Sequence, residues 1–226
     1  MRWGGALLFA AALVHFVYRF VITYGVPPAG SPARVPVVID LLLFTAFALH
    51  HSVFARTPVR AWIARLAPAH ERSIYVWIAS LLFIAVCALW QPVGGVAWSL
   101  EGPWRVEGWI LQALGVVLTL RGAAVLDFRE LAGITQGGPD QVRPARPLFS
   151  TAWPYGWIRH PIYLGWFLMV LPVGVMTNTR LVFALISCAY LVVAIPWEEK
   201  TLRRTSAGAY EEYSARVRWR LLPGVY

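Results

Sequence analysis

On two observations the sequence predicts an all-α, polytopic integral membrane protein. Of its 226 residues 58% are hydrophobic and only 14% are charged, whereas a soluble domain averages about 45–50% and about 25%. The apolar residues also gather in long runs, and a run of about 20 is enough to cross a bilayer core as a helix. A disordered chain is excluded, because such chains are poor in aliphatic and aromatic residues.

Four of the apolar runs are long enough for one span each, and they cover 3–24, 35–54, 73–90 and 106–126. A fifth apolar stretch, 162–196, is too long for one span and is interrupted by the sequence M-T-N-T-R at 176–180. We therefore expect about six transmembrane helices, of which the fifth and sixth form a short hairpin, followed by a cytoplasmic C-terminal helix. We also expect a single domain over 1–226, with a four-span half at 1–126 and a second half at 127–226.

Membrane topology accounts for the net charge of +9. With six spans, sixteen of the twenty cations fall on the side that holds both termini. They are Arg2, Arg56, Arg60, Arg65, Arg72, Arg121, Arg129, Arg143, Arg146, Arg159, Lys200, Arg203, Arg204, Arg216, Arg218 and Arg220. Because cytoplasmic loops are enriched in Lys and Arg, we expect both termini in the cytoplasm and the cell membrane as the location. The basic charge then gives no reason to expect a nucleic-acid partner.

Two ionisable residues, Arg19 and Asp40, lie within the predicted first and second spans. At 1.5 Å per residue both are about 7–8 Å deep from the same face of the membrane. An ionisable group in hydrocarbon costs several kcal/mol unless it is paired or hydrated. We expect the two residues to form a structural ion pair, and the alternative is a proton or ion path that also involves His15.

Several kinds of site are excluded. The chain has no glycine-rich dinucleotide or phosphate motif and no Cys/His cluster with metal-ligand spacing, so we expect no metal. Cys87 and Cys188 lie in apolar runs, and we interpret them as buried packing residues.

Polar residues concentrate at the two ends of the hairpin. Pro161 suits the first turn of a helix, where its missing N–H leaves nothing unsatisfied, and this makes His160 the capping residue. A helix N-terminus presents N–H groups to a polar or anionic ligand, and Tyr163 follows three residues after His160. At the other end of the hairpin are Glu198 and Glu199. Acidic residues contribute little to the orientation of a protein in the membrane, so topology does not account for this pair. The hairpin returns Glu198 to the face that holds His160, although 38 residues separate them.

Beyond the hairpin, Gly208, Tyr210 and Tyr213 are spaced to share one face of a C-terminal helix. An interfacial amphipathic helix held by Arg at anionic lipid explains this segment equally well.

Three motifs in order, R-H-P-x-Y-x-G, E-E-x-x-L and G-x-Y-x-x-Y, resemble the isoprenylcysteine carboxyl methyltransferase and phospholipid methyltransferase superfamily. They stand here as Arg159, His160, Pro161, Tyr163, Gly165, Glu198, Glu199, Leu202, Gly208, Tyr210 and Tyr213. The resemblance implies a membrane-embedded enzyme that binds S-adenosylmethionine at the cytoplasmic end of the hairpin, within the half at 127–226. The cofactor-binding residues that it implies are Tyr155, His160, Pro161, Ile162, Tyr163, Gly165, Glu198 and Glu199.

The N-terminal half is similar to the branch that contains bacterial methanethiol S-methyltransferases and NnrU-like proteins. The likeness is carried by L-H-H-S-V-F-A-R at 49–56, E-R-S-I-Y at 71–75 and W-Q-P at 90–92. Isoprenylcysteine enzymes carry an Arg one turn before the Glu pair, and here Ala194 stands at that position. The resemblance therefore favours a small apolar thiol such as methanethiol as acceptor, and a lipid or isoprenyl-type acceptor stays open.

A thiol acceptor benefits from a general base, and His51 is our candidate catalytic residue, with His50 second. The alternative for His51 is a helix-end histidine bonded to a carbonyl or lying at the membrane interface. We also expect the glycine- and proline-rich loop 127–161 to close over the cofactor.

Two other functions stay open beside the methyltransferase. Membrane sterol-type reductases that use NADPH have a similar R-H-P-x-Y-x-G ending, but they usually carry Asn and Glu where Ile162 and Trp166 stand here. The second alternative function is that of a non-enzymatic membrane accessory protein of the NnrU kind, with a vestigial pocket.

Overall fold

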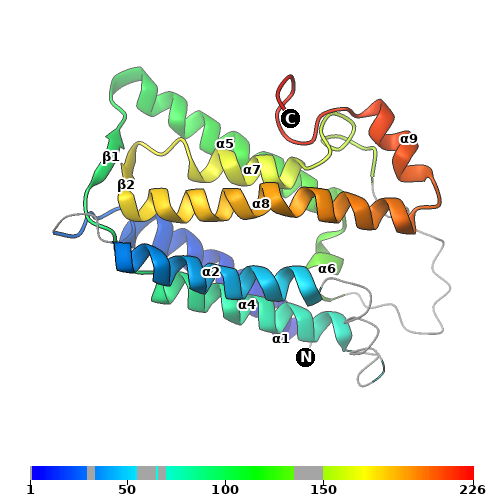
Figure 1. The fold of residues 1–226 in the computed structure, drawn as a ribbon, viewed down its shortest axis with the longest axis horizontal. Helices are drawn as coiled ribbons and strands as arrows, with labels where there is room; N and C mark the ends of the chain where they lie inside the picture. The colour runs from blue at the N-terminus through cyan, green and yellow to red at the C-terminus, as the bar shows by residue number, and fades with distance from the viewer. Residues whose placement is uncertain (1, 30–33, 55–64, 66–69, 135–149) are drawn as a thin grey trace. The chain divides into compact units, whose positions relative to one another are not determined.

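The structure is a computed structural model, and it describes residues 2–29, 34–54, 65, 70–134 and 150–226 (Figure 1). Helices make up most of these residues. In chain order the elements are α1 (Arg2–Tyr18), the π-helix η1 (Arg19–Thr23), α2 (Arg34–Phe54), α4 (Glu71–Leu89), β1 (Val96–Ser99), α5 (Gly102–Val125), α6 (Phe128–Leu131), α7 (Pro161–Val170), β2 (Val175–Thr177), α8 (Asn178–Thr205) and α9 (Ala209–Arg216). The two strands pair with each other.

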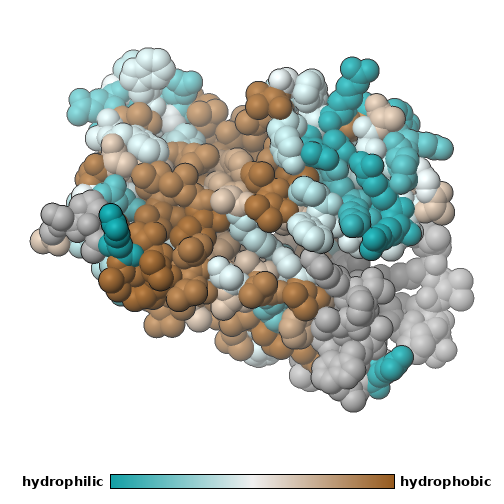
Figure 2. Space-filling model, viewed as in Figure 1, coloured by the Kyte–Doolittle hydropathy of each residue, from teal (hydrophilic) through white to brown (hydrophobic). Residues whose placement is uncertain are grey.

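Five of the described helices are long and apolar enough to cross a membrane: α1 continued by η1, α2, α4, α5 and α8. Their outer faces carry large hydrophobic side chains in the open, among them Val14, Leu42 and Trp109. Figure 2 shows this apolar surface over α2 and the first part of α8. So much exposed apolar area is unfavourable in water and favourable against lipid. The predicted all-α, polytopic membrane fold is therefore confirmed.

The predicted fifth span is a helix of only ten residues, α7. At 1.5 Å per residue it rises about 15 Å, roughly half of a hydrocarbon core of about 30 Å. The helix ends at Val170, with Leu171 as its cap. Pro172 follows, and a proline has no backbone N–H to continue the helical hydrogen bonds. The hairpin therefore consists of a half-length helix, a non-helical segment at 171–177 and one long helix.

α8 is longer than the predicted sixth span. It runs for 28 residues with Pro196 inside it, and the Glu pair lies within the helix rather than after it. Membrane helices tolerate an interior proline because neighbouring groups satisfy the freed backbone.

The described residues form two compact units. The first contains α1, η1, α2, α4 and the start of α8, up to Ile186. The second contains α5, α7, the rest of α8 from Ser187, and α9. α5, which we expected in the N-terminal half, thus belongs to the same unit as α7 and the Glu pair.

The core of the first unit is a cluster of aromatic rings around Phe183 of α8, whose side chain has no exposed surface. The ring centroid of Phe183 lies 5.5 Å from that of Phe16, 5.8 Å from that of Phe20 and 5.0 Å from that of Trp90. Aromatic pairs at such distances contribute about 0.5–1.5 kcal/mol each beyond the area they bury. One side chain of α8 therefore joins α1, η1 and the end of α4.

The predicted ion pair between Arg19 and Asp40 is wrong. Arg19 donates from Nε to the carbonyl of Cys87 at 2.9 Å and from Nη2 to that of Ala88 at 3.2 Å. The Oδ1 atom of Asp40 accepts the backbone N–H of Gln91 at 2.7 Å. The last carbonyls of a helix have no partner within it, so the end of α4 offers acceptors to Arg19. The N–H of Gln91, just after α4, is the donor for Asp40.

The helices of the second unit approach closely at two glycines. A Cβ atom on Gly115 of α5 would lie 2.6 Å from the carbonyl oxygen of Gly165 in α7, and one on Gly165 would lie 2.7 Å from the carbonyl oxygen of Gly115. Both obstacles are backbone atoms, which cannot move aside as the end of a side chain can.

We expect Gly115→Val to push α5 away from α7 and to lower the free energy of unfolding by about 2–3 kcal/mol, as overpacking does. Thermal unfolding in detergent measures the change. Leu114→Ala, at the exposed neighbouring position, is the matched control and should stay within about 0.5 kcal/mol of the wild type. Equal melting of Gly115→Val and the wild type would contradict the close approach.

Candidate functional site

A cavity of about 130 Å³ in the second unit brings together the motif-bearing segments. Its walls come from the end of α5, the turn before α7, the start of α7, the last part of α8 and α9. The residues that line it are Leu126, Tyr155, Arg159, His160, Ile162, Tyr163, Glu198, Leu202, Tyr210 and Tyr213. Side chains 35 or more residues apart thus meet at one site, as the three ordered motifs indicated.

The start of α7 is as predicted. Pro161 is the first helical residue and His160 is the cap. The backbone N–H of His160 donates to the carbonyl of Arg220 at 2.9 Å, and its own carbonyl accepts the N–H of Leu164 at 3.1 Å. The imidazole is stacked on the ring of Tyr163, with centroids 5.2 Å apart. Backbone and ring contacts therefore fix the position of His160.

Glu198 lies beside the first turn of α7, so the predicted meeting of the two hairpin ends is confirmed. Its Oε2 atom accepts the hydroxyl of Tyr163 at 2.8 Å and lies 3.7 Å from Nδ1 of His160. The carboxylate is about half exposed, at 47%. It is thus an oriented acceptor that a ligand can reach.

Glu199 lies in different surroundings, although it is the next residue. Its side chain is only 3% exposed, and it does not line the cavity. The carboxylate is 3.0 Å from Nη1 of Arg159, 3.2 Å from Nε of Arg220 and 3.3 Å from Nε2 of His160. A helix turns about 100° per residue, which sends the two carboxylates in different directions.

Two tyrosines of α9 complete the cavity, and sequence reasoning did not place them among the site residues. Tyr210 and Tyr213 are buried. Burial raises the pKa of Tyr213 to about 12, so its hydroxyl stays protonated and donates to the carbonyl of Tyr155 at 2.8 Å. α9 begins after Gly208, whose φ of +92° suits glycine. The G-x-Y-x-x-Y motif held the signal, but an interfacial helix explained that spacing as well.

Other predicted site residues lie elsewhere. Gly165 packs against Gly115 and the Oγ1 atom of Thr119 in α5, outside the cavity lining. Pro161 is buried at the start of α7 and also does not line the cavity. The expected closing loop lies largely at 135–149, outside the described residues.

His51 belongs to the first unit, near the end of α2. Its Nδ1 atom is 2.8 Å from the hydroxyl of Tyr75, so its partner is a side chain rather than the carbonyl that we considered. His50 is buried, and its ring lies 4.3 Å from that of Phe54 and 5.8 Å from that of Tyr75, centroid to centroid. A tyrosine-held histidine has the chemistry of a general base.

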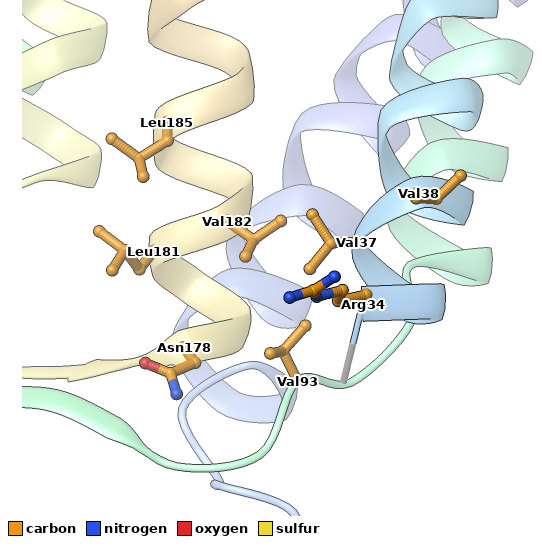
Figure 3. A pocket seen from close by; sticks show the side chains of 8 residues that line it. All are labelled: Arg34, Val37, Val38, Val93, Asn178, Leu181, Val182 and Leu185. Atoms are coloured by element: carbon orange, nitrogen blue, oxygen red, sulfur yellow. The ribbon is translucent and has the colours of Figure 1, made fainter. Parts of the chain in front are cut away.

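A larger cavity, of about 690 Å³, lies in the first unit between α2 and the start of α8 (Figure 3). Its lining consists of Arg34, Val37, Val38, Val93, Asn178, Leu181, Val182 and Leu185. Aliphatic side chains dominate it, and none of these residues can serve as a nucleophile or general base at neutral pH. The smaller cavity, whose lining includes His160 and Glu198, is therefore the candidate site despite its size.

In the part of the chain that the structure describes, no group of three or more His, Cys, Asp or Glu side chains could hold a metal ion.

The chain is similar over most of its length to proteins named methanethiol S-methyltransferase. It is 36% identical over 186 residues to that of Crocosphaera subtropica, which covers 80% of this chain and 72% of the relative. It is 32% identical over 222 residues to methanethiol S-methyltransferase 2 of Bradyrhizobium diazoefficiens, covering 92% and 85%. It is also 27% identical over 239 residues to nurim of Sus scrofa, covering 87% and 90%. No family model and no solved structure matches the chain.

We expect Tyr213→Phe to loosen α9 from the cavity, because the buried carbonyl of Tyr155 loses its donor. The free energy of unfolding should fall by about 1–2 kcal/mol, as measured by denaturant unfolding in detergent. Tyr18→Phe, which changes an exposed tyrosine of α1, is the control and should leave stability unchanged. A Tyr213 variant as stable as this control would refute the contact.

Proposed function

The chain belongs to the methanethiol S-methyltransferase family, and on this premise we propose that it transfers a methyl group from S-adenosylmethionine to a small thiol within the membrane. Methanethiol is the acceptor that the names of the relatives give. The meeting of Tyr163, His160 and Glu198 at one cavity is the observation that carries this proposal.

The side chains of the cavity suit the proposed cofactor. When bound, S-adenosylmethionine supplies an electrophilic methyl group on a sulfonium cation. Tyr155, Tyr163, Tyr210 and Tyr213 present aromatic groups, which attract cations and stack on flat rings. Glu198 carries the opposite charge and accepts hydrogen bonds from hydroxyl or ammonium groups.

The size of the cavity adds a condition. Ligand pockets usually have about 300–1,000 Å³, so a cavity of about 130 Å³ holds only part of such a cofactor. We expect it to widen on binding. Glu198 lines the cavity and is about half exposed. Its Oε2 atom accepts the hydroxyl of Tyr163, so we expect Oε1 to accept a hydrogen bond from the ligand.

His51 is our proposed general base for the thiol. A thiolate is the nucleophilic form of a thiol, so the S–H proton must leave as the sulfur attacks the methyl carbon. If Nδ1–H of His51 donates to the hydroxyl oxygen of Tyr75, the lone pair of Nε2 is available to take that proton. Nδ1 lies 2.8 Å from the hydroxyl of Tyr75, which fits this arrangement.

The cations around the cavity support an orientation for the protein. Arg159, Arg203 and Arg220 all lie beside the Glu pair, and cytoplasmic segments are rich in such residues. We propose that the cavity and both termini face the cytoplasm, where the cofactor is made, and that the location is the bacterial inner membrane.

Isothermal titration of the purified protein in detergent tests the cofactor. We expect S-adenosylhomocysteine to bind and NADPH not to bind. Glu198→Gln should weaken the binding of S-adenosylhomocysteine about tenfold or more, because a charged acceptor is lost. Glu212→Gln, at an exposed position of α9, is the control and should bind as the wild type does.

Each remaining function predicts a different titration. Binding of NADPH alone would favour the sterol-type reductase and overturn the methyltransferase. Binding of neither compound would favour the accessory protein.

The base is tested by His51→Ala, with dimethyl sulfide measured from methanethiol and S-adenosylmethionine. We expect the rate to fall by about 10²–10⁴, the usual contribution of general base catalysis, with the affinity for S-adenosylhomocysteine unchanged. Activity of this variant should recover as pH rises, since more of the thiol is then already ionised. His70→Ala, at an exposed histidine before α4, is the control. Full activity of His51→Ala would sink this role.

A further inference from the structure

The two adjacent glutamates of α8 have separate tasks. Glu198 lines the cavity, and its side chain is 47% exposed. The side chain of Glu199 is 3% exposed and does not line the cavity. A buried carboxylate without partners costs several kcal/mol, so the partners of Glu199 reveal what it is for.

One partner, Arg203, lies one turn further along α8, with its Nη2 atom 3.8 Å from Oε2 of Glu199. The other partners come from two separate segments. Arg159 and His160 precede α7, and Arg220 lies in the chain after α9. Oε1 of Glu199 is 3.0 Å from Nη1 of Arg159 and 3.3 Å from Nε2 of His160, while Oε2 is 3.2 Å from Nε of Arg220. One carboxylate therefore bridges the start of α7 and the chain after α9.

Backbone hydrogen bonds join the same two segments. The N–H groups of Arg159 and His160 donate to the carbonyls of Trp219 and Arg220, each at 2.9 Å. Nη2 of Arg159 also donates to the carbonyl of Arg218 at 3.0 Å. The chain after α9 thus lies directly against the residues that open α7.

The contact with Glu199 also sets the direction of the His160 ring. A carboxylate that lies within 4 Å of three guanidinium groups is ionised and accepts hydrogen bonds only, so Nε2 of His160 must be the donor. Nδ1 is then turned toward Glu198, 3.7 Å away. The ring is held between a buried carboxylate and one that faces the ligand.

We propose that Glu199 is the positioning residue of the cofactor site, acting through His160 and through the segment 217–221 that it ties to the start of α7. It does not itself contact the cofactor. This inference rests on the proposed function, because it names what orders the proposed cofactor site.

The first test is isothermal titration of Glu199→Gln with S-adenosylhomocysteine. Glutamine keeps the size of the side chain and removes the charge that orients Arg159, His160 and Arg220. We expect the dissociation constant to rise about tenfold or more, with the number of sites per folded protein unchanged. Glu211→Gln, an exposed position of α9, is the matched control and should match the wild type.

A double variant shows whether the effect passes through His160. His160→Ala removes the ring that Glu199 holds, so adding Glu199→Gln should then weaken binding by less than Glu199→Gln does in the wild type. The effect that remains is the part that passes through the segment 217–221. Independent, multiplying effects would overturn the role of His160.

The second test does not depend on the cofactor. Trypsin cleaves after arginine, and Arg216 and Arg218 are exposed in the chain beyond α9. We expect Glu199→Gln to be cut there faster than the wild type, because the segment is released, and Glu211→Gln to be cut at the wild-type rate. Mass spectrometry of the released peptide follows the cleavage. Equal rates in all three proteins would overturn the tie between Glu199 and this segment.

The outcomes separate this inference from the function on which it rests. If the wild type binds no S-adenosylhomocysteine, the proposed function fails and this inference falls with it. If the wild type binds but Glu199→Gln changes only the number of binding-competent molecules, with an unchanged dissociation constant, Glu199 serves folding alone and only this inference fails.

Discussion

The fold depends on one constraint: within a bilayer, backbone polar groups must find partners inside the protein, because hydrocarbon offers none. Helices meet this need along most of the chain. At the end of α4 the freed carbonyls are taken by Arg19, and the N–H of Gln91 is taken by Asp40. At the non-helical segment 171–177, the carbonyl of Gly174 accepts the N–H of Leu100. Charged side chains and non-helical segments within the spans thus supply hydrogen-bond partners to backbone groups that the helices leave unpaired.

The candidate site follows from the same irregularity. α7 stops after ten residues, so the hairpin contains one short helix and one long one. The first turn of α7 contacts Glu198 of α8 through Tyr163. Gly115 and Gly165 let the backbone of α7 lie close to that of α5. This close packing helps to hold a helix of limited length. Residues that line the cavity and residues that pack the helix therefore occur within one motif: Tyr163 lines the cavity, whereas Gly165 packs against α5.

Much of the site could be predicted from sequence, because a hairpin between His160 and Glu198 leaves little choice of where its ends meet. The role of Glu199 could not, since adjacent residues of a motif diverge only once the helix phase is known. Tyr210 and Tyr213 were equally hidden: their spacing suits a membrane-surface helix as well as a cavity wall. The pairing of Arg19 with Asp40 failed because depth in the membrane shows which charges are level, but not which backbone carbonyls and N–H groups lie beside each one.

The small volume of the cavity has a consequence for how tightly any ligand is held. If the wide form of the cavity is a minor part of the population, the observed dissociation constant equals the intrinsic one divided by the fraction of molecules in that form. Affinity is then governed by an equilibrium within the empty protein as much as by contacts with the ligand. A smaller side chain at Leu202, which lines the cavity, can thus strengthen binding while removing a contact, by making the wide form more common.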